Sequence, residues 1–134
     1  MASVVYPKAK EAFISGDIDL TTDDIRVICT DVADYTYDAA HDFLDDVAAG
    51  ARVGTSTALA SKTVTDGVFD AADITITSVS GDQFEALIIY KHTGVESTSN
   101  LIAYIDSGTG LPFTPSGGDI TITWDSGASR IFAL

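Results

Sequence analysis

The chain has few of the residues on which covalent or metal-based sites depend. Among its 134 residues are one cysteine, Cys29, and two histidines, His41 and His92. A single cysteine excludes an intramolecular disulfide, and the apolar residues beside Cys29 predict a buried thiol rather than a nucleophile. No HxH, HExxH or CxxC spacing occurs, so the sequence predicts no metal site of the zinc type.

Motifs for common catalytic and cofactor sites are lacking as well. The chain has no P-loop, no GxGxxG and no GxSxG, the patterns typical of nucleotide sites and of many hydrolases. Asp-Ser-Gly does occur twice, at Asp106 and Asp125, and aspartic proteases pair two such carboxylates. Too little chain follows either aspartate to close a protease lobe, and Asp-Ser-Gly is ordinary turn chemistry. We therefore expect no enzyme activity and no cofactor.

Positive charge and long apolar runs are scarce too. Seven Lys and Arg stand against 20 Asp and Glu, for a net charge of −13. This balance repels phosphates and anionic lipid, so neither nucleic acid nor a membrane surface is an expected partner. No apolar run approaches the ~18 residues of a membrane span, and the first ten residues lack the pattern of a signal peptide. We expect a soluble protein that is made and kept in a cytoplasm.

Glutamate is nearly absent, and what replaces it indicates the class of fold. Seventeen of the 20 acids are Asp, which favours turns and caps over helix interiors. The apolar fraction of 46% predicts a packed core despite the charge. The length predicts a single domain over 1–134.

Two short helices are expected in the N-terminal half. Apolar residues recur at helical spacing over 3–15, and Gly16 supplies a stop. The first residues of this stretch also suit an extended strand, and that alternative stays open. A second helix is expected over 39–47, with Asp38 as its cap.

The rest of the chain is expected to be β structure. The strand expected over 84–90 contains the continuous apolar run 86–90, which predicts a central strand buried on both faces. A long Pro- and Gly-rich loop is expected over 107–118, and a turn over 125–129. Several short strands with turn signals between them predict an antiparallel β-sandwich or small barrel. The other expected strands are 24–32, 57–64, 68–69, 74–79, 101–105, 120–124 and 131–134.

Residues 17–46 form an acidic stretch in which only Arg26 opposes ten aspartates. The plainest interpretation is a solvated surface with turn caps. A weak Ca²⁺ or Mg²⁺ site is a second interpretation, because Asp42, Asp45 and Asp46 would share a helix face, although no EF-hand spacing is present. A third is a docking surface for a basic partner. The ten residues are Asp17, Asp19, Asp23, Asp24, Asp31, Asp34, Asp38, Asp42, Asp45 and Asp46.

Aromatic residues offer a second kind of contact surface. Trp124 continues the apolar face of its strand, so we expect it in the core. Phe113 lies in the Pro- and Gly-rich loop and is the better candidate for an exposed anchor. The predicted docking surface combines aromatic and acidic residues: Tyr35, Tyr37, Asp38, Asp42, Asp45, Asp46 and Phe113.

A resemblance to a known family is carried by ten phrases of the chain: residues 6–10, 18–20, 24–27, 35–36, 41–47, 62–64, 67–73, 86–90, 101–106 and 118–124. They are similar to small virion proteins of tailed phages, in which a short helix leads into an apolar strand, and the similarity covers nearly the whole chain. Proteins of this family are usually labelled virion structural, head-decoration or minor tail proteins, and they contribute no catalytic residues.

The resemblance implies a part of an assembled particle. It implies a capsid decoration protein that docks on the major capsid protein or another virion protein, often as a symmetric homo-oligomer. The protein would be made in the bacterial cytoplasm and end in the virion. A minor tail or fibre component that binds a host receptor through its loops is the alternative. A small hydrolase or Ca²⁺-dependent module would require Asp106 and Asp125, or the acidic stretch, to converge.

Overall fold

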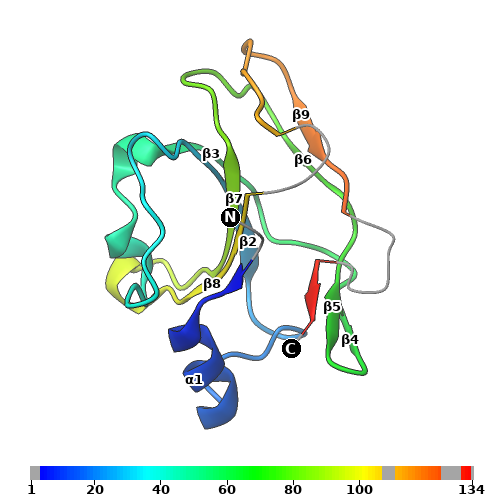
Figure 1. Cartoon of the computed structure of the whole chain (residues 1–134). Helices are drawn as coiled ribbons and strands as arrows, with labels where there is room; N and C mark the ends of the chain where they lie inside the picture. Colours follow the sequence, from blue (N-terminus) through cyan, green and yellow to red (C-terminus); the bar gives the residue numbers. More distant parts are fainter. Residues whose placement is uncertain (1–3, 107–110, 125–130, 134) are drawn as a thin grey trace.

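The structure is a computed structural model that describes residues 4–106, 111–124 and 131–133. It is mainly β, with short strands in antiparallel sheets and one α-helix (Figure 1). The prediction of a mainly β fold is confirmed. The sheets pack in the manner of a sandwich, and the strands of the described ranges do not close into a barrel.

A five-stranded antiparallel sheet forms the centre of the molecule. Its strand order is β1-β8-β7-β2-β3. The middle strand, β7, is buried along nearly its whole length, as its unbroken apolar sequence predicts for a strand covered on both faces. The strands are β1 (Val4–Val5), β2 (Ile25–Thr30), β3 (Arg52–Thr55), β7 (Ala86–Lys91) and β8 (Leu101–Ile105).

Two smaller sheets cover one face of this central sheet (Figure 1). One has the order β10-β5-β4 and the other pairs β6 with β9. Their side chains join those of the central sheet in one hydrophobic cluster. The strands are β4 (Thr63–Thr65), β5 (Val68–Asp70), β6 (Ile74–Ile76), β9 (Ile120–Ile122) and β10 (Phe132–Ala133).

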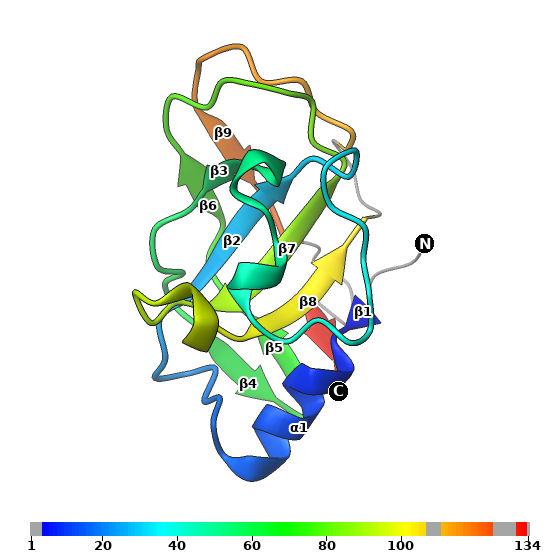
Figure 2. The ribbon, with the colours of Figure 1, turned by 90° about the vertical axis from the view of Figure 1, so that its left-hand side faces the viewer.

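Residues 31–51 cover the other face of the central sheet (Figure 2). This segment holds only two 3-10 turns, η1 (Leu44–Asp46) and η2 (Ala49–Ala51), so the predicted helix over 39–47 is wrong. Its backbone pairs across the fold instead. The N–H of Leu44 donates to the carbonyl of Ser99 at 2.9 Å, just after the third turn, η3 (Glu96–Thr98). A helix would have used these groups internally.

The N-terminal segment contains both of the structures considered for it, a short strand followed by a helix. Val4 and Val5 form β1, paired with β8, and the helix α1 spans Pro7–Ser15. Proline suits the first turn of a helix because its missing N–H has no intrahelical partner there. The helix ends at Gly16, whose φ of 85° is the left-handed conformation that glycine adopts readily. The stop is confirmed, and the helix is shorter than predicted.

Two strand predictions need correction. The predicted strand over 57–64 exists only as β4, while β3, which was not expected, forms around Gly54. A Cβ at Gly54 would lie 3.3 Å from Cγ1 of Val79, so close sheet packing explains a glycine in this strand. The alternation expected over 74–79 changes phase at Ser78, whose φ is 54°, and this turns Val79 inward.

Some sequence predictions fall on parts of the chain outside the described residues. These include the turn over 125–129 and the first part of the loop over 107–118. In the ranges that the structure does describe, no helix is long and apolar enough to cross a membrane.

Candidate functional site

The second half of the acidic stretch, residues 31–46, is fixed to the central sheet at its first residue. The N–H of Asp31 donates to the carbonyl of Ala51 at 2.9 Å, and its own carbonyl accepts from the N–H of Tyr35 at 3.1 Å. The buried Asp31 carboxylate accepts the N–H of Ala33 at 2.9 Å. The aspartate thus organises a tight turn that carries the chain from β2 onto the face of the sheet.

Four of the five tyrosines meet under this segment, and we call them the tyrosine cluster: Tyr6, Tyr35, Tyr37 and Tyr104. The ring of Tyr37 lies between those of Tyr6 and Tyr104, with centroid distances of 5.1 Å and 5.4 Å. The rings of Tyr35 and Tyr104 are 6.2 Å apart. All are tilted pairs, the geometry that the ring quadrupoles favour. The cluster joins the start of α1, the segment after β2, and β8.

A chain of hydrogen bonds connects the interior of the cluster to the acidic surface. The hydroxyls of Tyr6 and Tyr35 are 2.8 Å apart, and the hydroxyl of Tyr35 lies 2.9 Å from Nδ1 of His41. Burial raises the pKa of Tyr6 far above its usual value, and burial raises the pKa of Tyr35 to about 12. Both hydroxyls therefore keep their protons at physiological pH and serve as fixed positioning groups.

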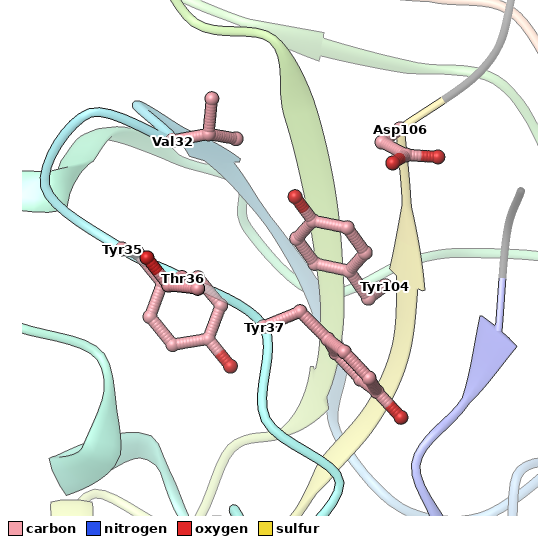
Figure 3. A pocket seen from close by; sticks show the side chains of 6 residues that line it. All are labelled: Val32, Tyr35, Thr36, Tyr37, Tyr104 and Asp106. Atoms are coloured by element: carbon pink, nitrogen blue, oxygen red, sulfur yellow. The ribbon is translucent and has the colours of Figure 1, made fainter. Parts of the chain in front are cut away.

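A cleft of about 310 Å³ opens beside the cluster (Figure 3). Tyr104 lies in the middle of the side chains that line it (Figure 3). The pKa of Tyr104 is raised first by burial and then by the negative charges of Asp106 and Glu85. The cleft therefore combines aromatic walls with a negative electrostatic field. We call it the tyrosine cleft, and its lining is Val32, Tyr35, Thr36, Tyr37, Tyr104 and Asp106.

Carboxylates gather at two places near the second half. Asp42, Asp45 and Asp46 each offer an oxygen within 4.8 Å of the others, as do the side chains of Asp31, Asp34 and Asp82. Oxygen ligands of this kind suit Ca²⁺ or Mg²⁺. Exposed acidic groups commonly lie together without an ion, so the geometry does not separate a cation site from a solvated surface.

The first of these carboxylate groups contains a coupled pair. The N–H of Asp42 donates to Oδ2 of Asp46 at 3.0 Å. Partial burial and the neighbouring Asp46 raise the pKa of Asp42. Partial burial also acts to raise the pKa of Asp46, but the N–H groups of Asp42 and Phe43 outweigh it and the pKa is lowered. Asp42 is thus the carboxyl group that takes up a proton first on acidification.

The predicted docking residues differ in exposure: Tyr35 is buried, and the others are half-buried or exposed. Tyr35 is only 4% exposed, so it supports the surface from beneath and contributes only a small part of its ring to the lining of the cleft. Tyr37 is half-buried at the tyrosine cleft. Phe113 is 37% exposed and packs on Phe84 with a centroid distance of 5.6 Å. The acids lie at or near the surface: Asp38, Asp45 and Asp46 are exposed and Asp42 is half-buried.

Sequence reasoning did not single out Tyr6 or Tyr104 for the site. Tyr6 precedes a helix and Tyr104 lies inside a buried strand, so both resemble ordinary core residues. Their signal in the sequence is weak: tyrosine carries a hydroxyl that needs a partner when buried. Such a signal indicates a polar contact without indicating which residue makes it.

The prediction of a buried thiol is confirmed. Cys29 is fully buried, and burial raises the pKa of its thiol to about 12, which keeps it protonated and unreactive. The prediction that Trp124 lies in the core holds only in part: the side chain is half-buried and packs against the core from its edge, and its Nε1 donates to the carbonyl of Ala72 at 3.1 Å. A hydrolase would require Asp106 and Asp125 to converge, and this requirement, which the sequence argues against, is untested because Asp125 lies outside the described residues.

Comparison with known proteins adds no assignment to this geometry. No protein-family model matches the chain, and no curated protein matches it. The tyrosine cleft and the acidic surface above it must therefore be interpreted from their own chemistry.

Proposed function

We propose that this chain is a non-enzymatic structural protein of a tailed-phage particle, and specifically a capsid decoration protein that docks on the assembled head. The observation that carries the proposal is the second half of the acidic stretch, residues 31–46. It lies on the outside of the central sheet, anchored from beneath by the tyrosine cluster. Within the described ranges, none of its acids forms an ion pair with Lys or Arg.

Such a surface has a physical use in an assembling particle. A strong net charge keeps unbound copies apart. A fixed acidic patch steers the protein to a basic patch on its partner and sets its orientation there. A protein that binds only the assembled shell stabilises that shell by mass action. The sequence resemblance to virion proteins supports the same role, with the major capsid protein as the expected partner.

The side chains best suited to catalysis have structural roles, which supports a non-enzymatic function. Cys29 is enclosed in the core. Nδ1 of His41 faces the hydroxyl of Tyr35 at 2.9 Å, and Nδ1 of His92 lies 3.5 Å from the hydroxyl of Tyr90. Neither histidine is paired with a nucleophile in these contacts.

A tail or fibre component that binds a host receptor is the second candidate. It is favoured by one observation, the exposed ring of Phe113 in the loop over 111–118. An exposed aromatic residue on a loop is a common anchor for a receptor or glycan. This role needs few copies in each particle, whereas a decoration protein is present in many.

The test is binding of the purified full chain to heads assembled from the major capsid protein of the same genome. We expect saturable binding of many copies per head, counted by quantitative mass spectrometry, and DNA release at a higher temperature from decorated heads. A double variant, Asp38→Asn with Asp45→Asn, should bind less tightly than the matched double variant Asp17→Asn with Asp66→Asn, which loses the same charge elsewhere. All four residues are exposed.

Two results would contradict the decoration role. One is an absence of binding to heads under conditions in which the chain is folded. The other is a low copy number in purified virions together with a changed host range on deletion, which would favour the receptor-binding role.

A further inference from the structure

The tyrosine cleft has the properties of a socket for a cationic side chain. Its walls are the faces and edges of three tyrosines, and its rim carries the carboxylate of Asp106 (Figure 3). An aromatic face attracts a cation through its quadrupole, and the attraction grows when the cation is partly desolvated. The volume of about 310 Å³ lies at the small end of the range of ligand pockets and is large enough for one long side chain.

Among the described residues, the charged groups that act on the tyrosines of the cleft are acids. Asp106 and Glu85 act on Tyr104, Asp38 acts on Tyr37, and Asp46 acts on Tyr35. Each of these acids makes the neighbouring tyrosine harder to ionise. The same field would stabilise a positive group placed among the rings.

The socket is also held in shape before any ligand enters. Tyr35 and Tyr104 are 4% and 5% exposed, and Tyr35 is fixed by hydrogen bonds with Tyr6 and His41. Glu85 reaches across from the start of β7 and accepts the N–H of Val32 at 3.1 Å. A preformed site loses little conformational entropy on binding.

We propose that the tyrosine cleft binds an arginine side chain presented by a basic segment of the docking partner. This inference rests on the proposed docking function and names the chemistry that the partner must supply. A guanidinium is favoured over an ammonium because it is planar, stacks on aromatic rings and is weakly hydrated. A neutral sugar would stack on the rings and donate hydroxyl hydrogen bonds to the acids, but it would gain no attraction between opposite charges.

The first experiment measures the cleft itself with a defined probe. The full chain, with isotope-labelled tyrosine, is titrated with a short capped peptide that carries one arginine, and then with the same peptide carrying citrulline. Citrulline has nearly the shape of arginine without its charge. We expect saturable shifts of the Tyr37 and Tyr104 ring signals with the arginine peptide, and binding of the citrulline peptide weaker by about tenfold.

Variants locate the binding site. Tyr37→Leu removes the aromatic face and should lower the affinity for the arginine peptide by about three- to tenfold. Tyr37→Phe keeps the face and should bind the peptide as tightly as the native chain does. Asp38→Asn preserves an acceptor for the N–H of Ala40, and it should weaken binding by about twofold and reduce its salt dependence. The control, Asp66→Asn, makes the same charge change in the turn between β4 and β5 and should have no effect.

Three results would overturn the proposal. Equal binding of the citrulline peptide would show that charge is not recognised. Equal weakening by Asp66→Asn and Asp38→Asn would show general attraction to an acidic protein. Shifts of Tyr37 and Tyr104 with a neutral oligosaccharide, and none with the arginine peptide, would assign the cleft to a glycan.

Binding to heads separates this inference from the function on which it rests. If heads bind the native chain and Tyr37→Leu equally tightly, the socket is wrong and the decoration role stands. If the arginine peptide enters the cleft of a chain that does not bind heads, the socket stands and the decoration role is wrong.

Discussion

The two halves of the acidic stretch are both rich in aspartate, but they differ in the Lys and Arg side chains that contact them. Residues 17–24 hold four aspartates and residues 31–46 hold six. In the first half, Asp24 receives two hydrogen bonds from Arg26, both at 3.0 Å. In the second half, the described residues form no ion pair with Lys or Arg.

Two distant lysines also contact the first half. Nζ of Lys91 donates to the carbonyl of Asp17 at 2.7 Å and lies 3.4 Å from Oδ2 of Asp23. Nζ of Lys62 donates to the backbone carbonyl of Asp23. These contacts tie the link between α1 and β2 to the sheets, so charge in the first half serves the fold.

The second half is held by other means. The guanidinium of Arg52 donates to the carbonyls of Leu44 and Val47, and the tyrosine cluster supports the segment from below. Four of its six acids are exposed to solvent, whereas Asp31 is buried and Asp42 is half-buried. A run of like charges can therefore stabilise the fold in one half and stay available for a partner in the other. The difference depends on which half the distant Lys side chains contact in the folded chain.

The largest effect is expected from removing the anchor of the second half. Arg52→Met removes the donor to the carbonyl of Val47 and one of the two donors to the carbonyl of Leu44, which keeps the N–H of Val47, and we expect a loss of about 2–3 kcal/mol in the free energy of unfolding by urea. Glu96→Gln removes only the exposed end of the same contact, an ion pair of 2.7 Å, and should cost far less than Arg52→Met because solvent screens an exposed ion pair. Similar losses in both variants would mean that the ion pair, rather than the carbonyl contacts, holds the segment.

The next effect concerns the tyrosines beneath the second half. Tyr6→Phe removes a fully buried hydroxyl that bonds to Tyr35, and we expect a loss of about 1.5 kcal/mol in thermal or urea unfolding. Tyr37→Phe is the matched control: Tyr37 is half-buried and its hydroxyl has no hydrogen bond among the described residues, so we expect a change below about 0.5 kcal/mol. Equal losses would show that the hydrogen-bond chain does not anchor the segment.

Local patterns in the sequence predicted much of the fold but little of this difference. The apolar run of β7 and the stop at Gly16 depend on neighbouring residues alone, so they could be predicted. The segment over 39–47 could not, because its backbone partners lie near Ser99, more than fifty residues away along the chain. The acidic stretch showed only Arg26 as a nearby cation, since Lys62 and Lys91 reach it through the fold. Of the site, the acids and Tyr37 could be predicted, whereas Tyr6 and Tyr104 depend on contacts that no local pattern indicates.

A smaller effect is expected from changing Lys91, which contacts the first half, and an effect of opposite sign from changing Asp45, an acid of the second half. Lys91→Met removes a hydrogen bond to the Asp17 carbonyl and an ion pair with Asp23, and should cost about 1 kcal/mol of stability. Asp45→Asn should instead stabilise by about 0.3 kcal/mol, because it relieves repulsion among neighbouring acids. The two signs are measured by urea unfolding at low salt, and both effects should shrink in 1 M salt. A loss of stability in Asp45→Asn would mean that this acid has a structural role.

The smallest effect is a difference in pH dependence between the halves. Hydrogen bonding to Arg26 lowers the pKa of Asp24 below its ordinary 3.8, so its contribution to stability is present at pH 7 and is lost as pH falls through the lowered folded value. Burial and Asp46 raise the pKa of Asp42 above 3.8, so ionised Asp42 destabilises the fold at pH 7 and stability returns as pH falls through that raised value.

Asn substitutions convert this difference into two measurements of opposite sign. After solvent screening, Asp24→Asn should lose about 0.5 kcal/mol at pH 7, and its gap from the native chain should close only below pH 3.8. Asp42→Asn should gain about 0.3 kcal/mol at pH 7, because its amide donates to Asp46 as protonated Asp42 does, and its gap should close before pH reaches 3.8. Urea unfolding of both variants between pH 7 and pH 3 tests the comparison. Curves of the same sign would mean that the acids of the second half are as well compensated as those of the first, and the case for a docking surface would lose its electrostatic basis.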